Sequence, residues 1–70
     1  MNPKEILKFL AENDIHIQGT DIRLVVYDYD YEGQYNVDVL AKSKNGDYST
    51  VLYCGWDLTE AIKIFKENNS

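Results

Sequence analysis

The feature that most constrains the fold is the alternating stretch of residues 35–41 and the turn signal that follows it. In an extended chain, successive side chains point to opposite faces. One face of this stretch carries Tyr35, Val37, Val39 and Ala41. Asn45-Gly46 comes next, and this dipeptide favours a two-residue type I′ turn, because both turn positions require positive φ. Residues 35–41 are therefore predicted to form a β-hairpin with residues 48–54.

The stretch that precedes Glu32-Gly33 also has strand chemistry, since β-branched and aromatic side chains dominate it. A turn at Glu32-Gly33 would place Val26 opposite Val39, and the later hairpin would place Leu52 on the other side of Val39. The two hairpins then agree on one inner face. Its predicted members are Ile22, Leu24, Val26, Val37, Val39, Ala41, Thr50, Leu52 and Cys54.

Two helix-start signals flank the predicted strands. Asn2 can cap a helix, with Pro3 at the first helical position and Glu5 completing a capping box. Asp57 and Glu60 repeat this spacing near the C-terminus. Apolar residues recur behind each start at helical spacing. They are Ile6, Leu7, Leu10 and Ala11 in the first helix, and Leu58, Ala61, Ile62 and Phe65 in the second.

These elements predict a single domain over residues 1–70 with an α+β fold in the order α-β-β-β-α. The predicted strands are residues 21–31, 35–41 and 48–54. They form a three-stranded antiparallel meander, and both helices pack on one of its faces. Ile15 and Ile17 are expected in an irregular connection under the first helix. A chain of 70 residues has one small core, with about 3–5 kcal/mol of net stability.

The opposite face of the predicted sheet mixes apolar, aromatic and acidic side chains. It would carry Val25, Tyr27, Tyr29, Tyr31, Asn36, Asp38, Leu40, Val51 and Tyr53. Such a face is too apolar for an ordinary solvated surface, and tyrosine combines an apolar ring with a hydroxyl that stays in water. Three interpretations remain open: a surface for a partner protein, a homodimer interface, or aromatic pairs that only brace the hairpins.

The segment DYDYEGQY begins like a calcium-binding loop. Such a loop needs oxygen ligands at positions 1, 3 and 5, glycine at position 6 and a glutamate at position 12. Asp28, Asp30, Glu32 and Gly33 satisfy the first part, but position 12 falls on Val39, which has no side-chain oxygen. The segment also lies between strands rather than helices. The sequence therefore predicts a hairpin tip with solvated carboxylates and no metal site.

No pattern of residues indicates catalysis or a cofactor. Cys54 is the single cysteine and His16 the single histidine, and nothing in the sequence brings them together. We expect Cys54 to be a buried structural thiol. The paired acids Asp28 and Asp30 resemble solvated charge more than glycosidase carboxylates, since so short a chain leaves little room for a substrate cleft. The chain is predicted not to be an enzyme, with no catalytic residues and no cofactor.

The charge distribution indicates what kind of partner the chain can bind. The net charge is −5, and the stretch between Arg23 and Lys42 contains four acidic residues and no basic one. This field repels phosphate backbones and attracts basic surfaces, so direct nucleic-acid binding is disfavoured. No apolar run reaches the ~20 residues of a membrane span, and no signal peptide is evident. The lone cysteine favours a reducing, cytoplasmic location.

Three resemblances bear on function. The helix-strand order is similar to that of double-stranded RNA-binding domains, but the second helix begins with Asp57, Thr59 and Glu60 instead of basic residues, so RNA binding is not implied. The segments YDYDYEGQYNVDV and GWDLTEAI resemble the acidic hairpin and helix start of HicB-type antitoxins. In size, charge and helix-first order the chain resembles small acidic phage anti-CRISPR proteins. This last resemblance implies an inhibitor whose acidic side chains occupy a nucleic-acid-binding groove.

The sequence thus predicts a small acidic protein-binding module. Its expected partner is a larger protein with a basic surface. That partner could be a nucleic-acid-binding protein, whose groove a phage inhibitor would occupy. The alternative is a homo-oligomeric protein, structural or HicB-like antitoxin, that pairs through the tyrosine-rich face, and a homodimer is one such assembly. The predicted partner-binding residues are Tyr27, Asp28, Tyr29, Asp30, Tyr31, Glu32, Asp38 and Tyr53.

Overall fold

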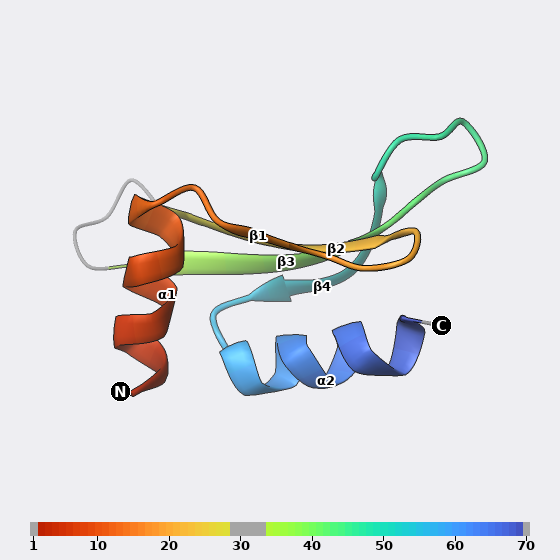
Figure 1. Cartoon of the computed structure of the whole chain (residues 1–70). Coiled ribbons are helices and arrows are strands. Elements are labelled where there is room, and N and C mark those ends of the chain that lie inside the picture. Colours follow the sequence, from red (N-terminus) through yellow and green to blue (C-terminus); the bar gives the residue numbers. More distant parts are fainter. Residues whose placement is uncertain (1, 29–33, 70) are drawn as a thin grey trace.

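Two helices flank four strands in the computed structural model, which describes residues 2–28 and 34–69 (Figure 1). The elements are α1 (Pro3–Glu12), β1 (His16–Gln18), β2 (Ile22–Asp28), β3 (Tyr35–Ala41), β4 (Thr50–Gly55) and α2 (Leu58–Asn68). The strands form one antiparallel sheet in the order β1-β2-β3-β4. The predicted α+β class is confirmed, whereas the predicted three-stranded sheet is wrong in the number of its strands.

Both helices begin where the capping signals predict. The backbone N–H of Glu5 donates to Asn2 Oδ1 at 2.9 Å, and Pro3 is the first residue of α1. The backbone N–H of Glu60 donates to Asp57 Oδ1 at 3.2 Å at the start of α2. Each cap side chain therefore satisfies a backbone donor that the helix itself leaves without an acceptor.

The additional strand, β1, occupies the segment that was expected to be an irregular connection. Ile17 pairs with Leu24 of β2, and both Ile15 and Ile17 are exposed rather than tucked under α1. A tight turn makes this pairing possible, since Gly19 N–H donates to the Ile22 carbonyl at 2.8 Å and Asp21 has φ 57°. Three residues are too few to show an alternating pattern, so the sequence carries no periodic signal for this strand.

The pairing of β2 with β3 differs from the predicted register by two residues. Leu24 lies opposite Val39, and Val26 lies opposite Val37. A shift of two keeps each side chain on its predicted face, because the side-chain period of a strand is two. The predicted turn at Glu32-Gly33 lies outside the described residues.

A bulge in β4 changes the faces of its second half. Leu40 lies opposite Val51 as predicted, but the register shifts at the next pair and Val39 lies opposite Tyr53 instead of Leu52. One extra residue on a strand exchanges the two faces beyond it. Tyr53 consequently packs against the core, whereas the prediction placed it on the opposite face. Cys54 becomes exposed, which contradicts the predicted buried thiol.

The connection between β3 and β4 is a turn of a different type from the predicted one. Gly46 N–H donates to the Ser43 carbonyl at 3.0 Å, so Lys44 and Asn45 are the central residues of the turn. Gly46 has φ 89°, and Asn45 is not among the described residues with positive φ. A type I′ turn at Asn45-Gly46 needs positive φ at both positions, so only the location of the predicted turn is confirmed.

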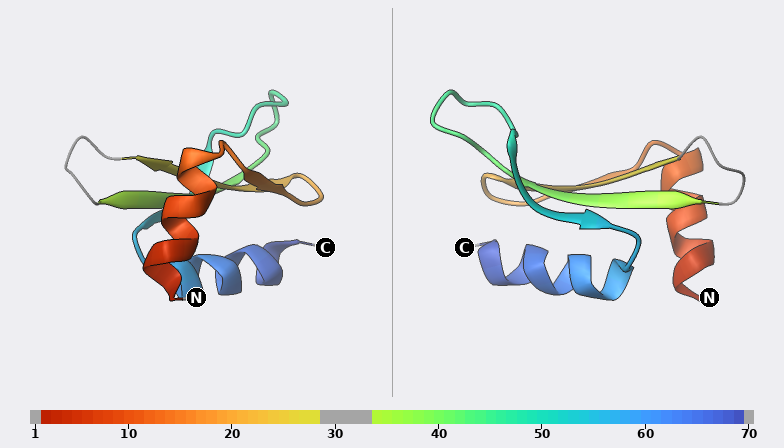
Figure 2. Two further views of the ribbon diagram at one scale, coloured as in Figure 1. Left: turned by 60° about the vertical axis from the view of Figure 1, so that its left-hand side comes forward. Right: turned by 180° about the vertical axis from the view of Figure 1, so that it is seen from behind.

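The helices and one face of the sheet enclose a single core, with α2 running beneath the sheet and α1 standing across one end of it (Figures 1 and 2). Its buried apolar residues are Leu7, Ile22, Leu24, Val26, Val37, Val39, Leu58 and Ala61. The predicted inner face is thus confirmed for β2 and β3. It is wrong for Cys54, which lies opposite Asp38 on the other face. Thr50 lies opposite Ala41 as predicted, although its side chain is exposed.

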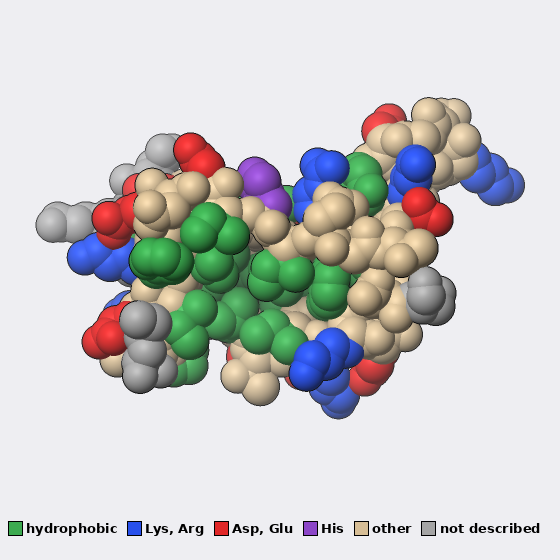
Figure 3. Space-filling view, viewed as in Figure 1, with side chains coloured by type: hydrophobic (Ala, Val, Ile, Leu, Met, Phe, Trp, Pro, Cys, Tyr) green, Lys and Arg blue, Asp and Glu red, His purple; other side chains and the backbone are tan. Residues whose placement is uncertain are grey.

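Part of the apolar surface beside β1 stays open. Phe9, Ile15 and Ile17 are exposed, and Figure 3 shows hydrophobic side chains gathered between α1 and α2. The two helices have few contacts with each other, so their packing leaves this side of the core partly uncovered. None of these residues belongs to the sheet face that faces away from the helices.

Candidate binding surface on the outer sheet face

The face of the sheet opposite the helices is the candidate binding surface, and it is called the outer face below. The strand registers place its members side by side, since directly opposed residues share a face. The members are His16, Gln18, Arg23, Val25, Tyr27, Asn36, Asp38, Leu40, Val51 and Cys54. Apolar side chains therefore alternate here with charged and amide groups.

A hydrogen-bonded cluster of Tyr27, Asn36 and Asp38 occupies the end of the outer face toward the β2–β3 connection. Asn36 Nδ2 donates to Tyr27 Oη at 2.8 Å and to Asp38 Oδ1 at 2.9 Å, and Cys54 Sγ lies 3.5 Å away. Asn36 is only 4% exposed, whereas Tyr27 is 40% exposed. A buried amide thus fixes the positions of a phenol and a carboxylate that reach solvent.

Burial raises the pKa of Tyr27 above its ordinary value of 10.0, and the negative charge of Asp38 raises it further. The hydrogen bond from Asn36 acts in the opposite direction, because it stabilises the phenolate. Cys54 adds a smaller unfavourable charge. The phenol therefore stays neutral through the physiological pH range and can serve as a hydrogen-bond donor.

The raised pKa of Tyr27 predicts how stability depends on alkaline pH. Folding favours the neutral phenol, so its contribution is fully present below the unfolded pKa of about 10 and is lost as pH rises through the folded value. We expect urea-unfolding midpoints to fall across this window in the wild-type chain and to fall less in Tyr27→Phe. Tyr35→Phe, which removes a hydroxyl from another tyrosine, is the control. Equal slopes for the wild type and Tyr27→Phe would contradict the expectation.

A second cluster holds the Arg23 side chain at the opposite end of the outer face. Arg23 Nε donates to Gln18 Oε1 at 2.8 Å, and the guanidinium carbon lies 4.1 Å from the centre of the Tyr48 ring. Gln18 Nε2 in turn donates to Tyr48 Oη at 2.8 Å. The guanidinium is therefore fixed by a hydrogen bond and by stacking on an aromatic ring. Sequence reasoning missed this cluster, because it depends on β1 and on the path of the β3–β4 connection.

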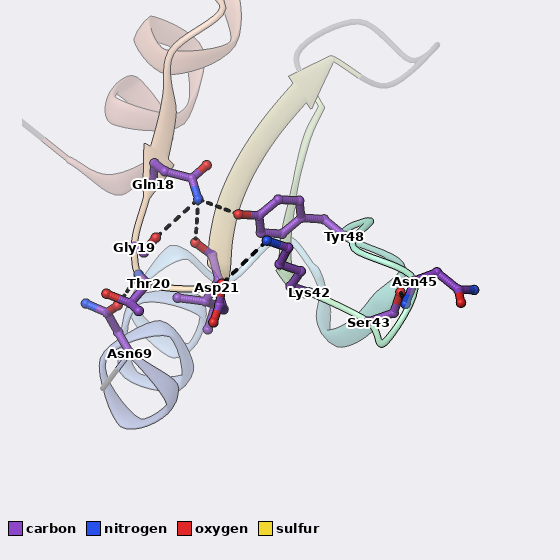
Figure 4. Close-up of polar contacts among 10 residues, drawn as sticks. Gln18, Gly19, Thr20, Asp21, Lys42, Ser43, Asn45, Tyr48 and Asn69 are labelled. Atoms are coloured by element: carbon purple, nitrogen blue, oxygen red, sulfur yellow. Dashed lines mark hydrogen bonds and ion pairs between the residues drawn. The ribbon is translucent and has the colours of Figure 1, made fainter.

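Other contacts link the β3–β4 connection and the C-terminus to the β1–β2 turn (Figure 4). Lys42 Nζ lies 3.8 Å from Asp21 Oδ1, and the Lys42 N–H donates to the Asp21 carbonyl at 2.9 Å. Thr20 N–H donates to Asn69 Oδ1 at 2.8 Å. These contacts hold the connection near β1, where Tyr48 reaches Gln18.

The predicted partner-binding residues fall into three groups. Tyr27 and Asp38 lie together on the outer face. Exposed Asp28 is the last residue of β2 and lies opposite Tyr35, so its register position is on the other face of the sheet. Tyr29, Asp30, Tyr31 and Glu32 lie outside the described residues. Tyr53 is on the helix side, where its hydroxyl accepts from the backbone N–H of Asp57 at 3.1 Å. Its predicted place on the outer face is therefore wrong, and its position is structural.

The described residues contain no group of three His, Cys, Asp or Glu side chains close enough to hold a metal ion. Within residues 2–28 and 34–69, no helix has the length and apolar character to cross a membrane. Asp28 is described, but Asp30 and Glu32 of the calcium-like segment are not, so the segment as a whole stays a prediction.

No family model, curated protein or solved structure matches this chain. The functional argument consequently rests on the geometry and charge of the outer face and of the adjoining end of β2.

Proposed function

We propose that this chain is a small acidic module that binds a larger protein at a basic surface, such as a groove that otherwise holds nucleic acid. The observation that supports the proposal best is the Tyr27–Asn36–Asp38 cluster, which lies at the end of the sheet where β2 ends with exposed Asp28. The exposed phenol of Tyr27 and the half-buried carboxylate of Asp38 are adjacent there, and the buried amide of Asn36 fixes both of them. A fixed aromatic side chain with a polar tip is typical of residues that contribute strongly to protein interfaces.

The charge of the chain supports the same kind of partner. A net charge of −5 attracts a positively charged surface, and carboxylates at one end of the sheet resemble the phosphates that such a surface binds. Asp30 and Glu32 follow Asp28 closely in the sequence and add negative charge to this part of the chain. Occupation of the groove by these carboxylates would exclude nucleic acid, which is the action of an inhibitor.

A comparison of two charge reversals tests whether the acidic end directs binding. Partners are first captured from the native host with the wild-type chain and eluted by salt, and the kinetics of the purified partner are then measured. Asp28→Lys is expected to slow association several-fold and to flatten its salt dependence, because exposed charges act by long-range steering. Tyr27→Ala is expected mainly to speed dissociation, since aromatic anchors supply contact energy.

Glu67→Lys in α2 is the matched control, because it changes the same charge at an exposed site of another element. If Glu67→Lys slows association as much as Asp28→Lys does, bulk charge explains the binding and the acidic end has no special role. A nucleic acid that the captured partner binds should compete with the wild-type chain. Simultaneous binding of both would contradict occupation of the groove.

Self-association through the outer face is a second candidate function. Arg23 and Asp38 carry opposite charges on one face, and apolar side chains lie between them.

A further inference from the structure

Four neighbouring side chains of the outer face form a rectangle with opposite charges on one diagonal. Arg23 of β2 lies opposite Leu40 of β3, and Val25 lies opposite Asp38. Arg23 and Asp38 therefore occupy two opposite corners, while Val25 and Leu40 occupy the other two. All four side chains are half-buried, so the patch reaches solvent at each corner.

We propose that this patch binds a second copy of the chain, in a two-fold symmetric dimer where Arg23 of each copy pairs with Asp38 of the other. A two-fold interface brings the same patch of both copies together, so the patch must be complementary to itself. The diagonal from Arg23 to Asp38 makes the patch self-complementary, because one of its ends is a cation and the other is an anion. A two-fold axis that lies in the plane of the interface, along the Val25–Leu40 diagonal, places Arg23 of each copy against Asp38 of the other.

The remaining side chains of the patch suit the centre of such an interface. Val25 and Leu40 lie close to the axis, and Val51 lies beside Leu40 on β4 with 58% of its surface exposed. Apolar groups at the centre with charged groups around them are the usual arrangement of a stable protein interface. The same patch has too many apolar groups for a sheet face that only contacts water.

The Arg23 side chain is already held in place for such a pairing. Gln18 accepts from its Nε and Tyr48 stacks on its guanidinium, so the terminal nitrogens lose little conformational freedom when they bind a carboxylate. Among the described residues, Lys8 and Lys42 form ion pairs within the chain, whereas Arg23 has no carboxylate within ion-pair distance. A carboxylate from a second copy can bind there without breaking an existing ion pair.

The dimer and the proposed heterologous partner would use overlapping surfaces, since both contact Asp38 and its neighbourhood. Self-association would then compete with partner binding. The dimer develops the second candidate function and does not depend on the proposed binding of a larger protein, because it can be tested with the purified chain alone.

Sedimentation of single charge reversals gives the first test. We expect the wild-type chain to dimerise at submillimolar concentration. Arg23→Glu and Asp38→Arg should each weaken self-association by ~100-fold, because each places two like-charged pairs in a symmetric interface. Lys63→Glu and Glu60→Arg change the same charges on exposed positions of α2 and should leave self-association unchanged. Circular dichroism establishes that each variant is folded.

Complementary variants give the decisive test. An equimolar mixture of Arg23→Glu and Asp38→Arg should form a heterodimer, since each copy then supplies the charge that the other requires at both pairs. The double variant carrying both substitutions should again form a homodimer. A merely destabilised fold would not be restored by mixing two separately weakened chains.

Three results would overturn the proposal. They are a wild-type chain that is monomeric at submillimolar concentration, folded single variants that dimerise as well as the wild type, and folded single variants whose mixture stays monomeric. None of these results bears on the acidic end of the sheet, which the partner-binding kinetics of Asp28→Lys test separately.

Discussion

Leu24→Ala is expected to remove most of the stability of this domain. Leu24 is 1% exposed and packs in the centre of the only core among the described residues. Truncation of a buried leucine costs about 2–5 kcal/mol, which includes the lost burial and the cavity that remains. A domain of this size has about 3–5 kcal/mol in total, so a large fraction of the variant should be unfolded at room temperature.

Urea unfolding followed by circular dichroism measures this effect, with Val51→Ala as the matched control. Val51 is mostly exposed on the outer face, so its truncation should change the midpoint little in dilute solution. Ile22→Val removes one methylene from the same core and should cost about 0.5–1.5 kcal/mol, which keeps the variant folded and measurable. Similar losses from Leu24→Ala and Val51→Ala would mean that the two faces of the sheet are assigned the wrong way round.

The parts of the fold that the sequence predicts are those with a local chemical cause. Asn2 and Asp57 cap their helices because a side-chain oxygen three residues before a backbone N–H can reach it. The faces of β2 and β3 were predicted although the register was wrong by two residues. The pattern alternates with a period of two, so an even shift leaves the buried set unchanged.

The predictions for β4 that were wrong concern a feature that no local sequence pattern marks. Val51, Leu52 and Tyr53 are three consecutive apolar residues, so the sequence of β4 does not show where one extra residue enters the strand. The bulge exchanges Tyr53 and Cys54 between the two faces. This single event explains both the wrong site residue and the wrong buried thiol.

The candidate site was predictable only where it lies within one hairpin. Tyr27 and Asp38 are adjacent because β2 and β3 pair, and the sequence predicts that pairing. The cluster around Arg23 requires β1 on one side and Tyr48 from a long connection on the other. Neither position follows from periodicity or turn chemistry, so the positive end of the outer face was missed.

Asn36→Asp is expected to destabilise the chain strongly at neutral pH, although the substitution hardly changes the shape of the side chain. Asn36 is 4% exposed, and its Nδ2 donates to both Asp38 and Tyr27. Aspartate removes this donor and places a second carboxylate against Asp38. An uncompensated buried charge of this kind costs about 3–5 kcal/mol.

The pH dependence of Asn36→Asp distinguishes charge repulsion from a packing defect. Burial and the neighbouring Asp38 carboxylate raise the folded-state pKa of the introduced carboxyl above its unfolded value of about 3.9. The penalty is therefore present at neutral pH and is relieved as pH falls toward the unfolded value. Urea midpoints of the variant should approach those of the wild type on acidification. A constant difference across this pH range would indicate a packing defect instead.

The double variant Asn36→Asp with Asp38→Asn tests the contact itself. It exchanges the amide and the carboxylate, so one donor and one acceptor again face each other, and we expect most of the lost stability to return. Asn45→Asp makes the same chemical change in the exposed β3–β4 turn and should cost little. If the double variant is no more stable than Asn36→Asp, the Asn36–Asp38 hydrogen bond does not hold the carboxylate in place. The two proposed uses of Asp38, toward a basic partner and toward Arg23 of a second copy, would then lose the fixed geometry on which both depend.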